Sequence, residues 1–454
     1  MKNRILNYIM AFALVVSGAA CEKRLDIEPK QSVDQSLALN TSSDVEAALI
    51  GAYQRAGDGD VLGGNAFVNA ELLGSFNEIN WAGTFQGMTQ IYNKSIPKNN
   101  TFVRDTWLDS YEAINVTNNV LDALDKVDAA KKDRVEGEAK FLRALLYFNL
   151  VKWFGKDWNN GDPNTNLGVP IITEPTRVIG EDNKVPRNTV AEVYAFVIQD
   201  LTDAKAKLPE TNSFFATTYS ASGLLARVYL QQSNFPGAAT EANRVIASNR
   251  YQLTQTYAES FPAPASPAAR PNTSEEIFSI QVTTTSGIND FNTYFSSNGR
   301  AEIDITDDHF NLYEPNDDRL SLFYVDGGAV YTGKHENQYG NVTIIRLAEM
   351  YLIRAEANFR LGGAPIGGVT PAQDINRIRA RVGLDPIADA DLTLENIISE
   401  RHLELAFEGF VVDDAKRLQR NIGATLWNSP LLVFPIPERE ILINDELEQN
   451  EGYF

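Results

Sequence analysis

The chain has little of the chemistry from which metal and redox sites are usually built. Its 454 residues include one cysteine and three histidines. A single thiol excludes an internal disulfide and any zinc site made from several cysteines of this chain. No two histidines have the i, i+4 spacing of a zinc-binding helix, so the spacing predicts no histidine-based metal site. The three histidines are His309, His335 and His402.

Positive charge is also scarce. The chain has 40 Lys and Arg against 60 Asp and Glu, a formal net charge of -20. Nucleic-acid affinity depends on clustered cations, so this balance predicts no nucleic-acid partner. The sequence also has no Gly-x-Ser-x-Gly elbow, complete phosphate-binding loop or dinucleotide fingerprint, which excludes the enzyme classes that depend on them.

The N-terminus has the three parts of a secretory signal peptide. Lys2 and Arg4 give a positive start, 8–16 is an apolar stretch, and small residues at 17–20 precede Cys21. Nine apolar residues cannot span a bilayer, which needs roughly 20. We predict a signal peptide at 1–20 and a lipidated N-terminus and tether at 21–40, because acyl chains on Cys21 would anchor the protein at a membrane.

One position departs from a lipoprotein processing site. The residue three before the cysteine is usually Leu, whereas this chain has Gly18. The alternative is ordinary secretory cleavage after Ala20, which would leave Cys21 as a free thiol.

Apolar residues recur at helical spacing through most of the remaining chain. One such segment carries Leu142, Leu146 and Trp153 on one side and stops before Gly155. The spacing predicts a mainly α fold with an extended C-terminal tail. The expected helices cover 43–54, 107–124, 136–154, 188–208, 219–232, 235–248, 342–361, 371–382 and 394–407.

The segments 219–232 and 235–248 form a predicted helical hairpin with tetratricopeptide-like spacing. Small residues at Ala226 and Ala238 allow close approach of the helices, and Tyr229 is expected to pack over the hairpin. The Ala-x-x-Tyr step recurs at 144–147 and 348–351, which is 82 residues before and 122 residues after the copy at 226–229. An uninterrupted array repeats about every 34 residues, so the helical scaffold is predicted to be split by insertions.

Two long segments, 57–100 and 251–341, are predicted to be irregular insertions in this scaffold, with a few short strands such as 277–283. Long irregular segments on a helical scaffold usually carry function. Sugar rings stack on aromatic side chains while neighbouring polar groups bind their hydroxyls. The ligand-binding candidates are therefore Asn80, Trp81, Phe85, Tyr92, Tyr294 and Tyr324. For Trp81 the alternative is a buried residue that anchors its loop.

Several acidic groups could suggest catalysis or metal binding. Glu400, Glu404 and Glu408 share one helix face, but glycosidase carboxylates must face each other across a substrate, so these are expected to form structural ion pairs. The same interpretation applies to the charged residues at 349–356. Ca²⁺ at 58–60 or at 304–308 is a secondary possibility, although neither segment fits the twelve-residue calcium loop.

Many short motifs, taken in order, resemble the RagB/SusD family of outer-membrane nutrient-binding lipoproteins of Bacteroidetes. They are LDIEP at 25–29, EAKFLRA at 138–144, GVP at 168–170, PR at 186–187, DDR at 317–319, IRLAE at 345–349, RAEA at 354–357, ER at 400–401, ELAFEG at 404–409, PIP at 435–437 and GY at 452–453. Val411 and Val412 depart from the family, which commonly has Arg and an aromatic residue there.

The resemblance implies a tetratricopeptide-like scaffold over 41–454 whose irregular segments bind a ligand. It also implies a non-enzymatic, lipid-anchored protein at the cell surface of the outer membrane. Such a protein would capture an oligosaccharide, or in some members a peptide, and pass it to a SusC-like TonB-dependent receptor. Glycan capture without a cofactor is the function we predict. The alternatives are a peptide-binding member, a surface glycoside hydrolase and a tetratricopeptide adaptor.

Overall fold

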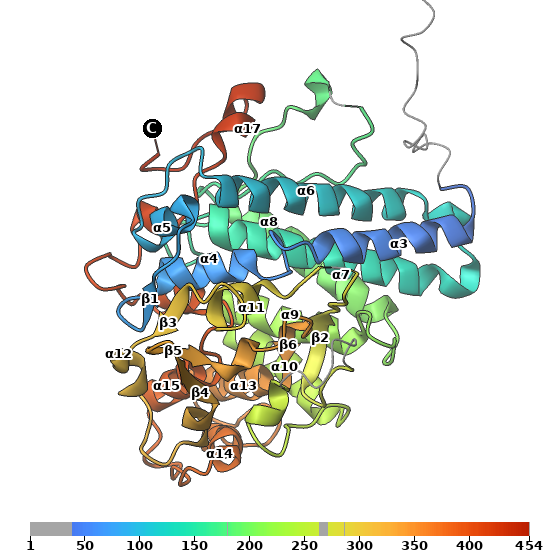
Figure 1. Cartoon of the computed structure of the whole chain (residues 1–454). Helices are drawn as coiled ribbons and strands as arrows, with labels where there is room; N and C mark the ends of the chain where they lie inside the picture. Colours follow the sequence, from blue (N-terminus) through green and yellow to red (C-terminus); the bar gives the residue numbers. More distant parts are fainter. Residues whose placement is uncertain (1–38, 179, 263–270, 286, 454) are drawn as a thin grey trace, which may run out of the picture.

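The computed structural model of the chain describes residues 39–178, 180–262, 271–285 and 287–453 (Figure 1). The predicted signal peptide, Cys21 and nearly all of the predicted tether lie outside the described residues. Within the described ranges, no helix combines the length and the apolar character needed to cross a membrane.

Four helices lie side by side and form one layer of the molecule (Figure 1). Their apolar faces meet in a core that includes Leu142, Leu146 and Trp153. They match four predicted segments, except that two of them start at 101 and 129 rather than at 107 and 136. The four are α3 (Ser42–Ala56), α6 (Thr101–Asp122), α7 (Ala129–Phe154) and α8 (Val190–Lys207).

The scaffold continues with a second group of helices, which includes the predicted hairpin. Ala226 and Ala238 are fully buried where the two helices of the hairpin meet. Tyr229 lies over Gly237, because a Cβ added to that glycine would come within 2.9 Å of the ring. The mainly α fold with helical hairpins is therefore confirmed. This group consists of α9 (Thr218–Gln231), α10 (Phe235–Ala247), α13 (Leu347–Leu361), α14 (Pro371–Arg381) and α15 (Leu394–Glu404).

The segment 342–361 is not one helix, as the apolar spacing predicted. It begins as strand β6 (Val342–Arg346), and α13 starts only at Leu347. Four of the five residues in this strand are β-branched, a composition that favours extended backbone. The strand pairs antiparallel with β2 (Glu276–Ile280), which lies within the predicted strand 277–283 apart from its first residue.

The C-terminal part also differs from its prediction. Helix α15 ends at Glu404 rather than at 407, and Phe407 has a left-handed φ of 63°. The tail, predicted to be extended, contains the short helices α16 (Val411–Arg417) and α17 (Glu438–Ile443).

Buried pairs of arginine and carboxylate connect neighbouring helices. Arg143 of α7 binds both carboxylate oxygens of Asp200 in α8, at 2.8 and 3.0 Å. Arg227 of α9 binds both oxygens of Glu349 in α13, each at 2.7 Å. Because both partners of each pair are buried together, neither charge is left uncompensated. Equivalent pairs are Arg354 with Asp374 and Arg417 with Glu356, which confirms the structural interpretation of the charges at 349–356.

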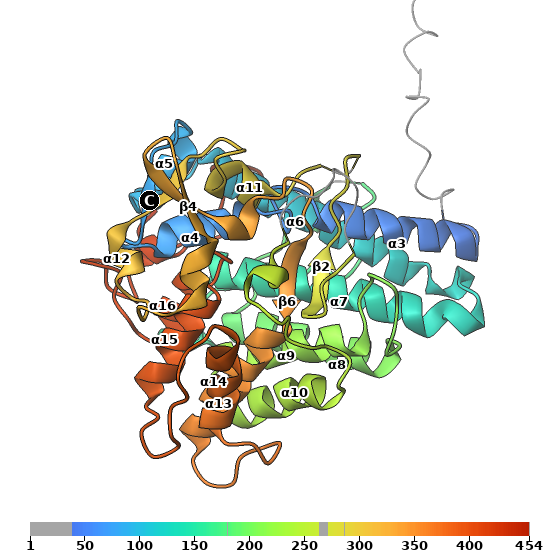
Figure 2. The same cartoon turned by 60° about the horizontal axis from the view of Figure 1, so that its bottom comes forward.

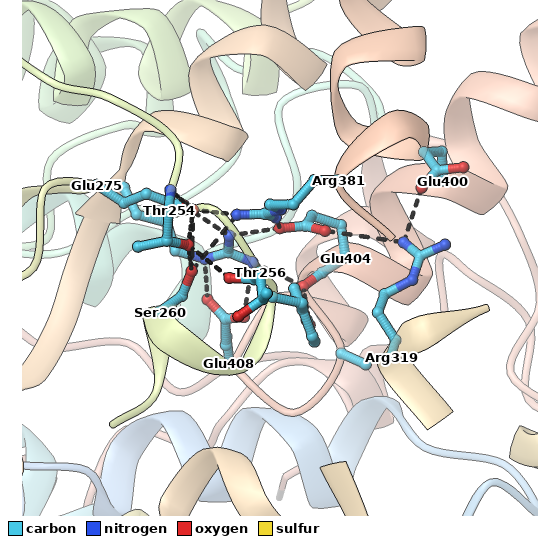
Figure 3. Close-up of polar contacts among 12 residues, drawn as sticks. Thr254, Thr256, Ser260, Glu275, Arg319, Arg381, Glu400, Glu404 and Glu408 are labelled. Carbon is cyan, nitrogen blue, oxygen red and sulfur yellow. Dashed lines mark hydrogen bonds and ion pairs between the residues drawn. The ribbon is translucent and has the colours of Figure 1, made fainter. Parts of the chain in front are cut away.

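A larger cluster of buried charges holds α15 against the strands and helices around it (Figure 3). Arg346 of β6 lies 2.6 Å from Glu404 and 2.9 Å from Glu408. Arg381 of α14 donates to both Glu275 and Glu404. This buried ion network balances five cations with five carboxylates and confirms that Glu400, Glu404 and Glu408 form structural ion pairs, although Glu408 lies beyond the end of α15. Its members are Glu275, Asp317, Arg319, Lys334, Arg346, Arg379, Arg381, Glu400, Glu404 and Glu408.

The two segments predicted as irregular contain short elements that meet each other. Strand β1 pairs antiparallel with β3, which brings 57–100 and 251–341 together. Figure 2 shows α4, α5, α11, α12 and β4 gathered at one end of the molecule. The first segment holds α4 (Asn65–Gly74), β1 (Ile79–Trp81) and α5 (Gln86–Tyr92). Besides β2, the second holds α11 (Asp290–Phe295), β3 (Ile303–Ile305), α12 (Asp307–Phe310), β4 (Phe323–Asp326) and β5 (Ala329–Thr332).

A close contact between α4 and α16 gives a first testable prediction. A Cβ on Gly74 would lie 2.4 Å from the backbone nitrogen of Val412 and 2.6 Å from Cγ1 of Val411. We expect Gly74→Ala to lower the free energy of unfolding by about 1–3 kcal/mol, because backbone must shift to admit the methyl group. Urea unfolding followed by circular dichroism measures this.

The matched control is a glycine inside α3. A Cβ on Gly51 would meet no atom within 4 Å. Gly51→Ala should therefore raise stability by up to about 1 kcal/mol through helix propensity. Equal effects of the two substitutions would contradict the close contact at Gly74.

Candidate functional site

The β1–β3 ribbon places polar side chains outside and apolar side chains inside. Asn80 pairs with Asp304 across the ribbon, and Nδ2 of the amide donates to Oδ1 of the carboxylate at 2.9 Å. Ile79 and Trp81 are buried, and the exposed Asn80 lies between them. Successive side chains of a strand point to opposite faces. Of these two predicted candidates, Asn80 therefore faces solvent and Trp81 faces the interior.

Trp81 is held inside the ribbon. Its indole is 8% exposed, and its Nε1 donates to the hydroxyl of Thr89 at 2.8 Å. Gly83 lies directly against the six-membered ring, because a Cβ there would come within 2.3 Å of it. Trp81 is therefore the buried anchor of its loop, the alternative considered above, and its face is closed to a ligand in this conformation.

Phe85 is the exposed member of an aromatic group at the end of the ribbon. Its side chain is 37% exposed, and its ring lies 6.4 Å from the ring of the buried Tyr294. Tyr294 in turn lies 6.1 Å from Trp81, so three predicted candidates from both segments do come together. The guanidinium of Arg300 lies 4.3 Å from the centre of the Phe85 ring and also binds Glu302.

Tyrosines lie near the Asn80–Asp304 pair. The hydroxyl of Tyr92 donates to the carbonyl of Ile79 at 3.1 Å. Burial, with a smaller contribution from the Asp304 carboxylate, raises the pKa of Tyr92 and likewise that of Tyr331, so both phenols stay neutral near this carboxylate.

The predicted candidate Tyr324 occupies the neighbouring β4–β5 hairpin. It is the cross-strand partner of Tyr331, and β5 packs beside β3. Its hydroxyl accepts a hydrogen bond from the backbone nitrogen of Ser297 at 3.0 Å. Tyr324 therefore fixes the loop after α11.

The exposed and polar groups on the ribbon and on the chain segments next to it have the chemistry to bind a polar ring compound. We call this group of residues the ribbon site and define it as Asn80, Phe85, Tyr92, Arg300 and Asp304. It offers an aromatic ring for stacking, an amide that can donate and accept, and a carboxylate and a guanidinium that can bind hydroxyl groups. No sequence pattern indicates Arg300, and Asp304 is indicated only as a calcium ligand, although the isoleucines on both sides of Asp304 have the alternation of a strand.

A larger groove of about 730 Å³ runs beside α6. Three of the polar side chains in it, those of Tyr111, Asn115 and Asn118, hold the chain at 170–176. Tyr111 donates to the carbonyl of Pro170 at 2.7 Å, and the Asn118 amide donates to that of Ile172 at 2.9 Å.

The structure adds Asp109 to the residues at 58–60 that are predicted as possible calcium ligands. Potential ligand atoms of Asp58, Asp60 and Asp109 lie within 4.8 Å of one another. Burial, and then repulsion by the two other carboxylates, raise the pKa of Asp109 to about 6. Asp60 already accepts a hydrogen bond from Asn65 at 2.9 Å. Calcium binding stays a prediction at this cluster.

Comparisons with known proteins agree on one protein family. Residues 23–230 match a family model described as "Starch-binding associating with outer membrane", and residues 319–430 match the SusD family model. SusD-like protein P2 of Formosa agariphila is 26% identical over 487 aligned positions, which cover 91% of this chain and 93% of that protein.

Solved structures resemble the fold over most of its length. A SusD superfamily protein from Bacteroides thetaiotaomicron has a TM-score of 0.80 and 25% identity, covering 90% of this chain and 99% of that one. A laminarin-binding SusD-like protein has a TM-score of 0.72 and 25% identity, covering 91% of this chain and all of that one.

Proposed function

The chain belongs to the SusD family, and we propose that it captures an oligosaccharide at the ribbon site and delivers it to a SusC-like TonB-dependent transporter of the outer membrane. The starch-binding family description and the laminarin-binding neighbour support carbohydrate as the class of ligand. We place the binding site at the ribbon because its Asn80–Asp304 pair is exposed to solvent. The chain that follows β1 carries the exposed ring of Phe85.

Binding at the ribbon site would be non-covalent. The apolar C–H face of a sugar ring can stack on Phe85, whose ring is already oriented by Tyr294 and Arg300. Asp304 accepts hydrogen bonds from hydroxyl groups, and the Asn80 amide both donates and accepts. Because Trp81 and Tyr294 hold the ribbon from inside, little side-chain freedom is lost when a sugar binds.

We propose that the protein is not an enzyme. A glycosidase needs two carboxyl groups on opposite sides of the sugar, about 5 to 9.5 Å apart. The partner of Asp304 across the ribbon is an amide, and Glu302 is neutralised by Arg300. Glu400 and Glu404 of α15, and Glu408 just after it, are buried within the ion network.

Affinity electrophoresis tests the class of ligand. The protein is run in gels containing soluble polysaccharides, among them laminarin and soluble starch, and is titrated in parallel with a mixture of casein peptides. We expect retardation by at least one polysaccharide and no binding of the peptides. Peptide binding without retardation by any polysaccharide would contradict the proposal and favour the peptide-binding alternative.

Cys21 lies outside the described residues, and we propose it as the lipid anchor that keeps the protein beside its transporter. In a host strain that lacks the transporter, Cys21→Ala should move the protein from the membrane fraction to the soluble fraction. The physical reason is the loss of acyl chains, each buried methylene of which contributes about 0.8 kcal/mol of membrane affinity. Ser17→Ala in the same leader is the control and should stay in the membrane fraction. A membrane-bound Cys21→Ala variant would exclude lipidation as the anchor.

A further inference from the structure

Two histidines and a glutamate from distant parts of the chain converge at the base of the β1–β3 ribbon. Glu78 directly precedes β1, His309 belongs to α12, and His402 belongs to α15. Oε2 of Glu78 lies 2.7 Å from Nδ1 of His309 and 2.7 Å from Nε2 of His402. One potential ligand atom of each residue lies within 4.8 Å of the other two. The three side chains thus share one centre.

The surroundings fix one side of this centre. His309 is fully buried, and its ring lies 4.7 Å from that of Phe407. The ring nitrogen of His309 that faces away from Glu78, Nε2, lies 3.0 Å from the hydroxyl of Tyr313. A histidine that binds a metal through one nitrogen usually has its other nitrogen hydrogen-bonded in this way, because the bond sets the direction of the ring.

The other side of the centre is open. The side chains of His402 and Glu78 are 33% and 26% exposed. Both residues line a groove of about 360 Å³, whose walls include Phe76, Leu312 and Asp414. An ion that enters the groove can therefore reach Glu78 and His402. All three side chains also line a smaller cavity of about 20 Å³, which has room for about one water molecule beside them.

We propose that Glu78, His309 and His402 bind a divalent transition-metal ion, and that Zn²⁺ is the ion that fits best. Two imidazole nitrogens and one carboxylate oxygen are ligands that Zn²⁺ accepts, with water as the fourth ligand. Zinc bond lengths of about 2.0–2.2 Å in a tetrahedron place ligand atoms roughly 3.3 Å apart. The two 2.7 Å separations must therefore widen by roughly half an ångström, and the partly exposed His402 has room to move.

An ion bound at this position would affect the structure of the ribbon. The backbone nitrogen of Thr306 donates to the carbonyl of Glu78 at 3.1 Å, so the start of β1 and the end of β3 meet at the proposed ligands. A bound ion would tie both strands to α15 and make the ribbon more rigid. The metal site does not depend on the proposed function, because its ligands are separate from the ribbon site.

Calorimetry with ZnCl₂ and absorption spectroscopy with CoCl₂ test the site. The chain is used untagged and with Cys21→Ser, so that no thiol or added histidine competes, after removal of metal by a chelator. We expect one Zn²⁺ per chain, and visible absorption bands of tetrahedral Co²⁺. Glu78→Gln and His402→Gln should each weaken Zn²⁺ binding at least 100-fold, and Tyr313→Phe about 10-fold or more.

Asp60→Asn is the matched control, because it alters the other cluster of potential ligands and should leave Zn²⁺ affinity unchanged. Zn²⁺ should also raise the melting temperature of the parent chain but not that of Glu78→Gln. Absence of Zn²⁺ binding with unit stoichiometry, or full affinity in both Glu78→Gln and His402→Gln, would show that the three residues form a hydrogen-bonded cluster only and would overturn the proposal.

Discussion

Replacing Glu404 by glutamine is expected to lower the free energy of unfolding by about 3–5 kcal/mol, because it leaves buried cations without their counter-charge. Glu404 is fully buried, lies 2.6 Å from Arg346, and also accepts from Arg381. Burial opposes its ionisation, but Arg381, Arg346 and Arg319 outweigh this and hold the pKa of Glu404 well below its usual range. Urea unfolding at neutral pH measures the loss.

The control for this prediction is an exposed ion pair. Glu395 binds Arg420 at the surface, where the two side chains are 65% and 45% exposed. Glu395→Gln should cost less than about 1 kcal/mol, since water replaces the lost partner. Losses of equal size in the two variants would contradict the importance of the buried ion network.

The lowered pKa of the Glu404 carboxylate determines how the stability of the fold should change with pH. Its pKa is lower in the folded state than in the unfolded state, so its stabilisation is fully present above the unfolded value of about 4.3 and is lost as the pH falls towards the folded value. The stability difference between the parent chain and Glu404→Gln should therefore shrink as the pH falls below about 4. A difference that grows on acidification would contradict this assignment.

Removing the carboxylate of the ribbon site is expected to weaken glycan binding strongly. Asp304→Ala should raise the Kd for a retained polysaccharide about 10- to 100-fold, because hydrogen bonds to a charged group are worth about 1.5–3 kcal/mol. Phe85→Ala should raise it about 10-fold through loss of stacking on the ring that is 37% exposed. Isothermal titration with the polysaccharide that retards the parent protein measures both constants.

Two matched substitutions separate this effect from general loss of surface groups. Phe214 is similarly exposed, at 47%, but lies between α8 and α9. Asp182 is an exposed aspartate that lines the groove beside α6. Phe214→Ala and Asp182→Ala should leave the Kd unchanged. If Asp182→Ala weakens binding while Asp304→Ala does not, the glycan binds beside α6 instead.

The helical scaffold could be predicted from the sequence because apolar residues recur every three to four positions in the long helices, including α7 and α9, which are buried on nearly all sides. That signal located α9 and α10 to within a residue or two. It failed at β6, where an apolar run continues into α13 without a break in hydrophobicity. There the β-branched composition, rather than the apolar spacing, indicates the strand.

The candidate site was only partly predictable from the sequence, because its residues lie far apart along the chain. The loop aromatics Trp81, Phe85 and Tyr294 do meet, but which of them faces solvent depends on β1, a strand of three residues whose partner β3 lies more than 200 residues later. His309 and His402 are 93 residues apart in sequence, and no local spacing could show that both reach Glu78.

A crystal structure of the protein with an oligosaccharide from the polysaccharide it binds most tightly would show where the glycan lies. We expect a sugar ring stacked on Phe85, or hydrogen-bonded to Asn80 and Asp304, with Trp81 still buried beneath the ribbon. An oligosaccharide seated instead beside α6, against Tyr111, with the ribbon site empty, would contradict the proposed binding site.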